Sequence, residues 1–334
     1  MARDQGAYSI SRRSFCWTLI GVLVAPDIAI AQASNLVRRI GVLDPGMPDP
    51  PELLWKEAEP LRKLGWVEGK NLQVERRYDN GRSEALQSLA EELVRAQVEI
   101  ILTGGTLATL AAKRATTTIP IVFSTGDPVL LGLVASLARP GGNLTGIAQA
   151  GPEVTAKYLS VLKELLPGLK RIGVLSQMGD PYDRATRDQF EHICQSLGLA
   201  PTIVEIGGAA EIDGAIAQLM RQHSEALVLG NGAFIWDHRF EIVEVATKRG
   251  SPTMAEFPAM VREAGALIAY NCTQVEHDRL RAEYIDRILR GARPGDLPVR
   301  QPTKFELVIN LKTARALGLT IPKELLLRAD EVIQ

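Results

Sequence analysis

The stretch Arg39-Ile40-Gly41-Val42-Leu43 occurs a second time as Arg171-Ile172-Gly173-Val174-Leu175. Each copy is a short apolar run that begins with a basic residue and is followed by turn-forming residues, which is typical of a buried strand leading into a helix. A Leu-Gly pair follows each copy at nearly the same distance, as Leu64-Gly65 and Leu197-Gly198. A repeat of five common residues can also arise by chance. The simplest interpretation is two α/β lobes, each opened by this strand.

Strand and helix patterns alternate through both halves of the chain, which predicts parallel sheets covered by helices on both faces. One predicted helix spans residues 129–138 and another spans residues 237–249. The tail differs, because a long amphipathic helix over residues 275–290 precedes a strand over residues 305–309. Neither lobe needs this tail to complete its sheet, so we expect the tail to pass between the lobes and join them.

The 334 residues suit two lobes, and the formal net charge of -1 creates no field that would attract nucleic acid.

Residues 1–31 have the pattern of an export signal: an apolar run from Phe15 to Ala25, too short to span a membrane, and a cleavage pattern at Ala29-Ile30-Ala31. The stretch Ser11-Arg12-Arg13-Ser14-Phe15 resembles a twin-arginine signal, and an ordinary secretory signal is the alternative. The sequence predicts an exported protein with no stable membrane insertion after the signal is removed.

Two cysteines, Cys194 and Cys272, remain after the signal. A disulfide is possible in an oxidising compartment, but nothing in the sequence requires the two residues to be close, so we expect two free thiols.

Ligands of open parallel sheets bind beyond the carboxyl ends of the strands. At one such end, the turn Thr103-Gly104-Gly105-Thr106 offers backbone amides and hydroxyls at a helix start, so Gly105 and Thr106 are predicted to bind an anion. The alternative is a tight turn in which Thr106 is only a helix cap. The turn lacks the spacing of nucleotide-binding loops, so no nucleotide is predicted.

Two acidic residues at strand ends, Asp127 and Glu256, are predicted to bind a cationic group, which with the anion site would hold a zwitterion. A turn acid and a solvated surface acid are the respective alternatives. The predicted ligand-binding set is completed by residues in equivalent loops: Asp44, Ser124, Gln177 and Asn231. Asn231 lies between two glycines and could equally be a turn former.

Signatures of enzymes are absent from the sequence. It contains no GxSxG motif, and His192, His223, His238 and His277 show no metal-ligand spacing. We therefore predict no catalytic residue, no metal and no cofactor.

Four stretches resemble the substrate-binding components of bacterial ABC importers of the tryptophan/tyrosine type. They are Leu64 to Gly69, Asp127 to Val129, Ser136 to Gly146 and Gln301 to Ala314. The resemblance covers essentially the whole mature chain and implies a type I periplasmic-binding fold, with two Rossmann-like lobes, parallel sheets and a three-segment hinge. It also implies a small-molecule ligand, a permease and an ATPase as partners, and a periplasmic location.

On this resemblance, residues 36–148 with 274–296 form the N-terminal lobe, and residues 150–272 with 300–334 form the C-terminal lobe. We expect a monomer that closes on a small polar or zwitterionic molecule, such as an amino acid or a related small acid. A ligand sensor that presents its solute to a receptor is one alternative. An exported enzyme on the same scaffold is another, but it would need a cluster of catalytic groups that the sequence does not show.

Overall fold

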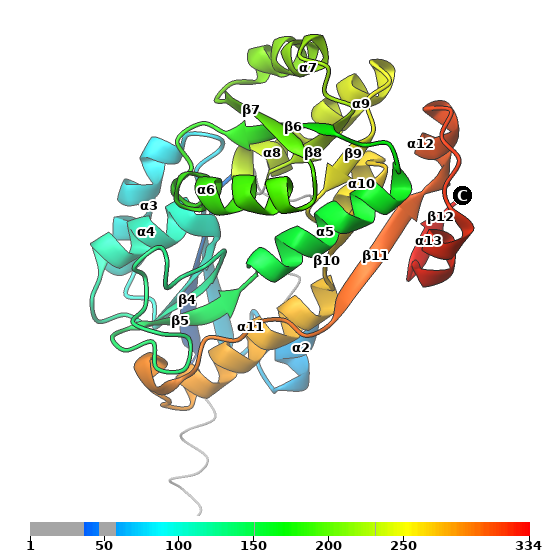
Figure 1. The fold of residues 1–334 in the computed structure, drawn as a ribbon. Helices are drawn as coiled ribbons and strands as arrows, with labels where there is room; N and C mark the ends of the chain where they lie inside the picture. Colours follow the sequence, from blue (N-terminus) through cyan, green and yellow to red (C-terminus); the bar gives the residue numbers. More distant parts are fainter. Residues whose placement is uncertain (1–36, 47–57, 150, 231) are drawn as a thin grey trace, which may run out of the picture. The chain divides into compact units, whose positions relative to one another are not determined.

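The computed structural model describes residues 37–46, 58–149, 151–230 and 232–334, and in these residues the chain forms two β-sheets covered by helices (Figure 1). The predicted export signal and Asn231 lie outside the described residues. Among the described helices, none is long and apolar enough to cross a membrane. The α/β class predicted from the repeat is confirmed.

The first sheet has five parallel strands in the order β2-β1-β3-β4-β5. Its strands are β1 (Arg38–Asp44), β2 (Leu72–Tyr78), β3 (Ile100–Gly104), β4 (Ile121–Thr125) and β5 (Leu144–Ala148). The helices packed around it are α2 (Ala58–Lys63), α3 (Leu86–Arg95), α4 (Gly105–Ala115) and α11 (Gln274–Leu289), with the 3-10 helix η2 (Ser83–Ala85) before α3. Alternate residues of β1 point into different cores: Leu43 packs with α3 and α4, and Ile40 packs with α2 and α11. The apolar run of the first repeat copy is therefore buried on both faces.

The second sheet has seven strands in the order β12-β11-β10-β9-β8-β6-β7. They are β6 (Arg171–Gln177), β7 (Ala200–Ile206), β8 (Ala226–Leu229), β9 (Thr253–Ala255), β10 (Ile268–Cys272), β11 (Phe305–Asn310) and β12 (Glu331–Ile333). Its helices are α5 (Pro152–Leu165), α6 (Pro181–Ser196), α7 (Ile212–Arg221), α8 (Ala233–Asp237), α9 (Arg239–Lys248), α10 (Pro258–Ala264), α12 (Leu311–Ala316) and α13 (Lys323–Arg328), with η3 (Ala209–Glu211) before α7. The second repeat copy is β6, so the repeated sequence does open each sheet.

The tail contributes more than a connection, and the prediction that neither sheet needs it was wrong. β11 pairs antiparallel with β10, and β12 pairs parallel with β11, so the tail adds two strands to the second sheet. The physical reason is that β10 would otherwise expose a row of unpaired backbone groups. The sheet is consequently mixed rather than wholly parallel.

The chain passes between the two sheets three times, as the implied fold requires. The first passage leads from β5 to α5, and the second leads from β10 to α11, which packs against β4, β5 and α2. The third follows η4 (Pro294–Asp296) and leads into β11 (Figure 1). Near the first and third passages, Ile147 and Arg300 form an isolated parallel bridge, so these two segments run side by side.

The predicted helix over residues 129–138 does not form. The chain instead makes turns: Asp127 accepts hydrogen bonds from the backbone amides of Val129 and Leu130, and Gly132 adopts a left-handed φ of 62°. Apolar periodicity alone could not show that the Asp-Pro pair starts a closed turn here. The predicted helix over residues 237–249 forms as α9, and a separate short helix, α8, precedes it and ends at Asp237.

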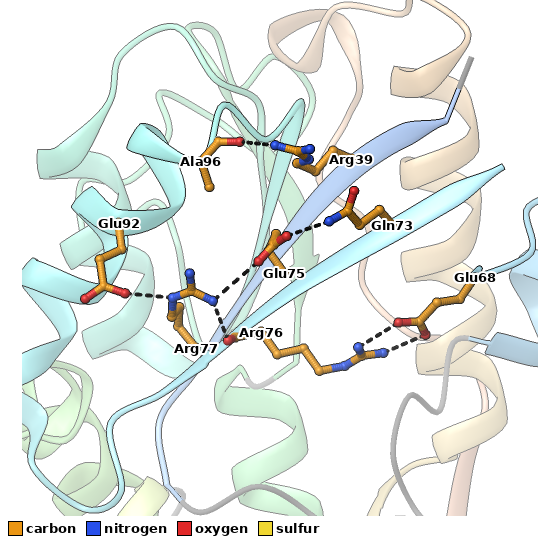
Figure 2. A network of polar contacts seen from close by, with 8 residues as sticks. All are labelled: Arg39, Glu68, Gln73, Glu75, Arg76, Arg77, Glu92 and Ala96. Atoms are coloured by element: carbon orange, nitrogen blue, oxygen red, sulfur yellow. Dashed lines mark hydrogen bonds and ion pairs between the residues drawn. The ribbon is translucent and has the colours of Figure 1, made fainter. Parts of the chain in front are cut away.

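The outer edge of the first sheet is covered by ion pairs rather than by another strand (Figure 2). Arg76 donates two hydrogen bonds of 2.8 Å to Glu68, and Arg77 bridges Glu92 and Glu75. Charged side chains on an edge strand disfavour pairing with another chain. This network is therefore a structural feature of β2, the edge strand of the first sheet.

Both remaining cysteines are free and buried, which confirms the predicted thiols. Burial raises the pKa of each thiol to about 12, so both stay protonated near neutral pH.

Gly146 provides a test of the first sheet. Its φ is 155°, and a β-carbon there would lie 2.7 Å from the backbone nitrogen of Phe123 on the neighbouring strand. We expect Gly146→Ala to lower the free energy of unfolding by about 3 kcal/mol, because backbone atoms of a paired strand cannot move away. Urea denaturation measures this, with Gly168→Ala as the control, since no atom lies within 4 Å of a β-carbon at that position. A loss below about 0.5 kcal/mol would contradict the prediction.

Candidate ligand-binding site

The predicted residues of the first sheet lie at the carboxyl ends of its strands, but most of their polar atoms are already engaged. The Thr106 hydroxyl is 2.9 Å from the Thr125 hydroxyl, and the Ser124 hydroxyl is 2.7 Å from Nε2 of His277. Asp127 caps the turn described above. Asp127 is therefore a turn acid, which was the alternative to ligand binding. Only its second carboxylate oxygen is left to bind a ligand.

The other predicted residues differ in what their side chains contact. Asp44 packs against Gly104, whose β-carbon would lie 2.6 Å from Oδ1 of Asp44. Gln177 accepts a hydrogen bond of 3.1 Å from the backbone amide of Phe234 and so joins the end of β6 to the start of α8. Glu256 follows β9 and lines a cavity, which makes it the predicted acid best placed for a ligand.

Two close approaches bring the strand ends of the two sheets together. The ring of Tyr182, in the first turn of α6, lies against Gly126 at the end of β4 and leaves no room for a β-carbon. Gly46, after β1, is approached in the same way by the carboxylate of Asp237, at the end of α8. From the repeat, the loops after β1 and β6, residues 44–47 and 177–180, are expected to lie opposite each other. The close approaches in the described residues instead join Gly46 to Asp237 of α8 and Gly126 to Tyr182 of α6.

A cavity of about 90 Å³ lies beside the strand ends of the second sheet, between the sheet and helices α5 and α6. We call it the aromatic cavity, because Tyr158, Tyr182 and Phe190 form part of its wall. Apolar residues of β6, β7 and β8 line its inner part, and Ser176, Asp183 and Glu256 supply polar groups. An apolar chamber with a few polar groups is the usual form of a small-molecule site.

Carboxylates dominate the electrostatics of this cavity. The pKa of Asp183 is raised to about 6, chiefly by burial. A hydrogen bond from Ser176 and the charge of Arg187 lower this pKa, and the charges of Asp180 and Glu205 raise it. Burial also raises the pKa of Asp180, which caps α6 through the amides of Tyr182 and Asp183.

The two phenols of the cavity are kept neutral. Burial raises the pKa of Tyr158 and of Tyr182, and the negative charge of Glu256 raises both further. Asp127, from the first sheet, also raises the pKa of Tyr182. Carboxylates from both sheets therefore act on the same tyrosine, and an ammonium group placed near it would be stabilised.

Four residues of the cavity were not predicted from the sequence: Tyr158, Tyr182, Asp183 and Phe190. After β6 only Gln177 was predicted, although the first turn of the following helix also lies beside the strand ends. The Asp180-Pro181 pair marks that helix start and could have extended the search by one turn. Tyr158 and Phe190 gave no such signal, because an aromatic residue on an apolar helix face usually belongs to the core. No group of three or more possible metal ligands occurs among the described residues.

Two α/β units that meet at their strand ends, with a cavity beside the contact, have the type I periplasmic-binding fold. The chain belongs to the family described as ABC transporter substrate binding protein, whose model matches residues 57–333. The family predicted from the sequence is confirmed.

Three proteins of known name or structure are similar to the chain. It is 27% identical over 269 residues to a tyrosine-binding protein of Clostridioides difficile (strain R20291), covering 78% of this chain and 74% of that protein. A conserved domain protein from Vibrio cholerae has a solved structure with 26% identity and a TM-score of 0.81, covering 89% of this chain and 99% of that one. An "ABC domain in complex with L-Trp" from Streptococcus pneumonia has 25% identity and a TM-score of 0.80, with the same coverage.

Proposed function

We propose that this protein is the solute-binding component of an ABC importer and that it closes on an aromatic amino acid or a closely related small zwitterion. The observation that carries the proposal is the aromatic cavity at the strand ends, whose Tyr182 also contacts Gly126 of the other sheet. A ligand beside Tyr182 would touch both sheets, so its binding energy would favour the closed arrangement. The names of the tyrosine-binding and L-Trp-bound relatives support the same class of ligand.

The proposal assigns a role to each part of the cavity. The cavity of about 90 Å³ is smaller than one aromatic ring requires, so the proposal requires its apolar interior to widen when it receives the aromatic side chain of the ligand. Asp183 and Glu256 receive the ammonium group of the ligand. The ligand carboxylate would lie toward the first sheet, where Gly105 begins α4 and offers a helix amide. Asn231 remains a predicted further contact. This arrangement requires no catalytic group.

The proposal also places the protein in its cell. We propose that residues 1–31 direct export to the periplasm and that the monomer delivers its solute to a permease and its ATPase. The N-terminal lobe would comprise residues 36–148 and 274–296, since α11 packs on the first sheet. The C-terminal lobe would comprise residues 150–272 and 300–334, since β11 and β12 extend the second sheet.

Thermal unfolding with a panel of ligands tests the function. L-Tryptophan or L-tyrosine at about a hundred times its Kd is expected to raise the midpoint by about 5 °C, because binding to the folded state alone adds about 2.7 kcal/mol. Indole-3-propionate, which lacks the ammonium group, and tryptamine, which lacks the carboxylate, should raise it much less. If both analogues stabilise the protein as well as the amino acid does, the ligand is not recognised as a zwitterion.

A further inference from the structure

The strand that leads into the second passage carries a buried side chain whose hydrogen-bonding capacity is only half used. Asn271 is the penultimate residue of β10 and is fully buried. Its Oδ1 accepts a hydrogen bond of 2.7 Å from the backbone amide of Cys272, whereas its Nδ2 has no partner among the described residues. A buried amide nitrogen without an acceptor disfavours the state of the protein that contains it.

The neighbouring strand does not supply the missing acceptor. Glu306 of β11 is paired with Asn271 in the ladder between β10 and β11, so the two side chains lie on the same face of the sheet. The two carboxylate oxygens of Glu306, however, accept hydrogen bonds of 3.0 and 2.6 Å from Arg262 of α10. Arg262 also forms an ion pair with Glu331 of β12. The acceptor opposite Asn271 is therefore already engaged within the second sheet.

Asn271 lies where two of the three passages run together. Just beyond β10, the backbone amide of Thr273 donates a hydrogen bond of 3.0 Å to the carbonyl oxygen of Lys304, which precedes β11. The hydroxyl of Thr273 then caps α11, the helix that packs on the first sheet, by accepting from the amide of Glu276. A rotation of one lobe against the other is therefore absorbed within a few residues of Asn271.

Other buried polar atoms without a partner lie away from the passages. The hydroxyls of Ser224 and Ser251 are examples, and these residues precede β8 and β9 respectively. Since β8, β9 and β10 run parallel, both serines lie at the amino ends of the strands, whereas Asn271 lies at the carboxyl end. A rotation of the lobes leaves the surroundings of the two serines unchanged, but it alters those of Asn271.

The unpartnered nitrogen belongs to an arrangement in which the lobes touch. Tyr182 of α6 lies against Gly126 of the first sheet, as described above. Asn271 is therefore left without an acceptor when the lobes are in contact, and separation of the lobes is the motion that changes its surroundings.

We propose that Asn271 is a conformational restraint that favours separated lobes in the empty protein and so limits how tightly the protein binds its solute. When the lobes separate, water or a backbone carbonyl of the adjoining passages reaches the Nδ2 of Asn271. When they close, this hydrogen bond is lost, which disfavours the closed arrangement about tenfold. The proposal rests on the proposed function only in that the lobes close on a ligand.

Distances between spin labels on the ligand-free full chain test this restraint. The labels are attached at Ser88→Cys on α3 and Gln195→Cys on α6, two exposed positions on different lobes, while both native cysteines are buried. Asn271→Ala should raise the population with closed lobes about tenfold, because no donor is left unpartnered on closure. Asn271→Ser should do the same, since its hydroxyl can rotate toward a neighbouring carbonyl oxygen.

Ser251→Ala is the matched control, because it removes a buried hydroxyl that has no partner but lies away from the passages. It should leave the closed population unchanged. The two Asn271 variants should also bind L-tryptophan about tenfold more tightly than wild type, as measured by calorimetry, because less binding energy is used to close the lobes. Thermal unfolding shows whether each variant is folded.

The proposal is overturned if folded Asn271→Ala and Asn271→Ser leave the closed population unchanged, or if Ser251→Ala raises it equally. It is overturned as well if the wild-type protein is wholly closed without ligand, since no restraint then keeps the lobes apart. If wild-type protein does not bind L-tryptophan, the proposed ligand is wrong, and the label distances measured without ligand still decide whether Asn271 restrains closure.

Discussion

Replacing Gly126 with valine is expected to reduce the affinity for L-tryptophan at least a hundredfold. A β-carbon at this position would lie 2.5 Å from Cζ of Tyr182, well inside any real contact distance. The two sheets could meet only if the tyrosine or the whole of α6 moved away. Since closure is what brings the ligand into contact with both lobes, a lobe contact that cannot form removes most of the binding energy.

The expected change concerns binding rather than folding. In the open arrangement Tyr182 no longer presses on Gly126, so the unfolding midpoint without ligand should stay within a few degrees of wild type. Isothermal titration calorimetry measures the affinity, with Gly168→Val as the matched control in an open position. The double variant Gly126→Val/Tyr182→Ala should recover at least tenfold over Gly126→Val. Wild-type affinity in Gly126→Val would show that the bound state does not contain this contact.

Replacing Asp183 with asparagine is expected to weaken L-tryptophan at least tenfold at pH 7.5, because the ammonium group loses its buried counter-charge. The wild-type affinity should itself fall as the pH is lowered through about 6, where Asp183 takes up a proton. The affinity of Asp183→Asn should change little over the same range. Asp188→Asn, an exposed aspartate on the same helix, is the control.

The ionised Asp183 is expected to strengthen ligand binding but to lower the stability of the protein without ligand. Its pKa is raised by folding, so the folded state binds the proton more tightly than the unfolded chain. Its contribution to stability is fully present below the ordinary pKa of 3.8 and is lost as the pH rises through about 6. At pH 7.5 the free energy of unfolding of Asp183→Asn, measured by urea denaturation, should therefore exceed that of wild type by on the order of 1–2 kcal/mol. At pH 4 the two proteins should differ little.

These two measurements separate a ligand contact from a structural residue. If Asp183→Asn is more stable without ligand but binds L-tryptophan more weakly, then Asp183 binds the ligand although its charge destabilises the empty protein. If Asp183→Asn binds L-tryptophan as tightly as wild type between pH 5 and pH 8, the ammonium site lies elsewhere, and Glu256→Gln becomes the next variant to test.

Much of the fold could be predicted because each strand is a local pattern. The two repeat copies lie within β1 and β6 as predicted, since each is a short apolar run followed by turn formers. The helix over residues 129–138 was predicted wrongly, because Leu133 and Val134 are buried by a series of turns that follow Asp127 and Pro128. Apolar spacing records which side chains are buried, but it does not record the backbone conformation that buries them.

The site was harder to predict than the fold. Glu256 was recognised because it follows a strand, and it does line the aromatic cavity. Tyr158 was not recognised, because its place on α5 resembles a core position in the sequence. The Thr106 hydroxyl was a reasonable anion ligand until the structure showed Thr125 beside it.

The sequence by itself determined that this chain would form two α/β units, each opened by one copy of Arg-Ile-Gly-Val-Leu, because an apolar strand followed by a helix is encoded within a few residues. The tertiary structure alone decided which strand ends meet: Tyr182 reaches Gly126, and β11 turns antiparallel to complete the second sheet. Such contacts join residues far apart in the chain, and their energies depend on shape and burial that no local pattern contains.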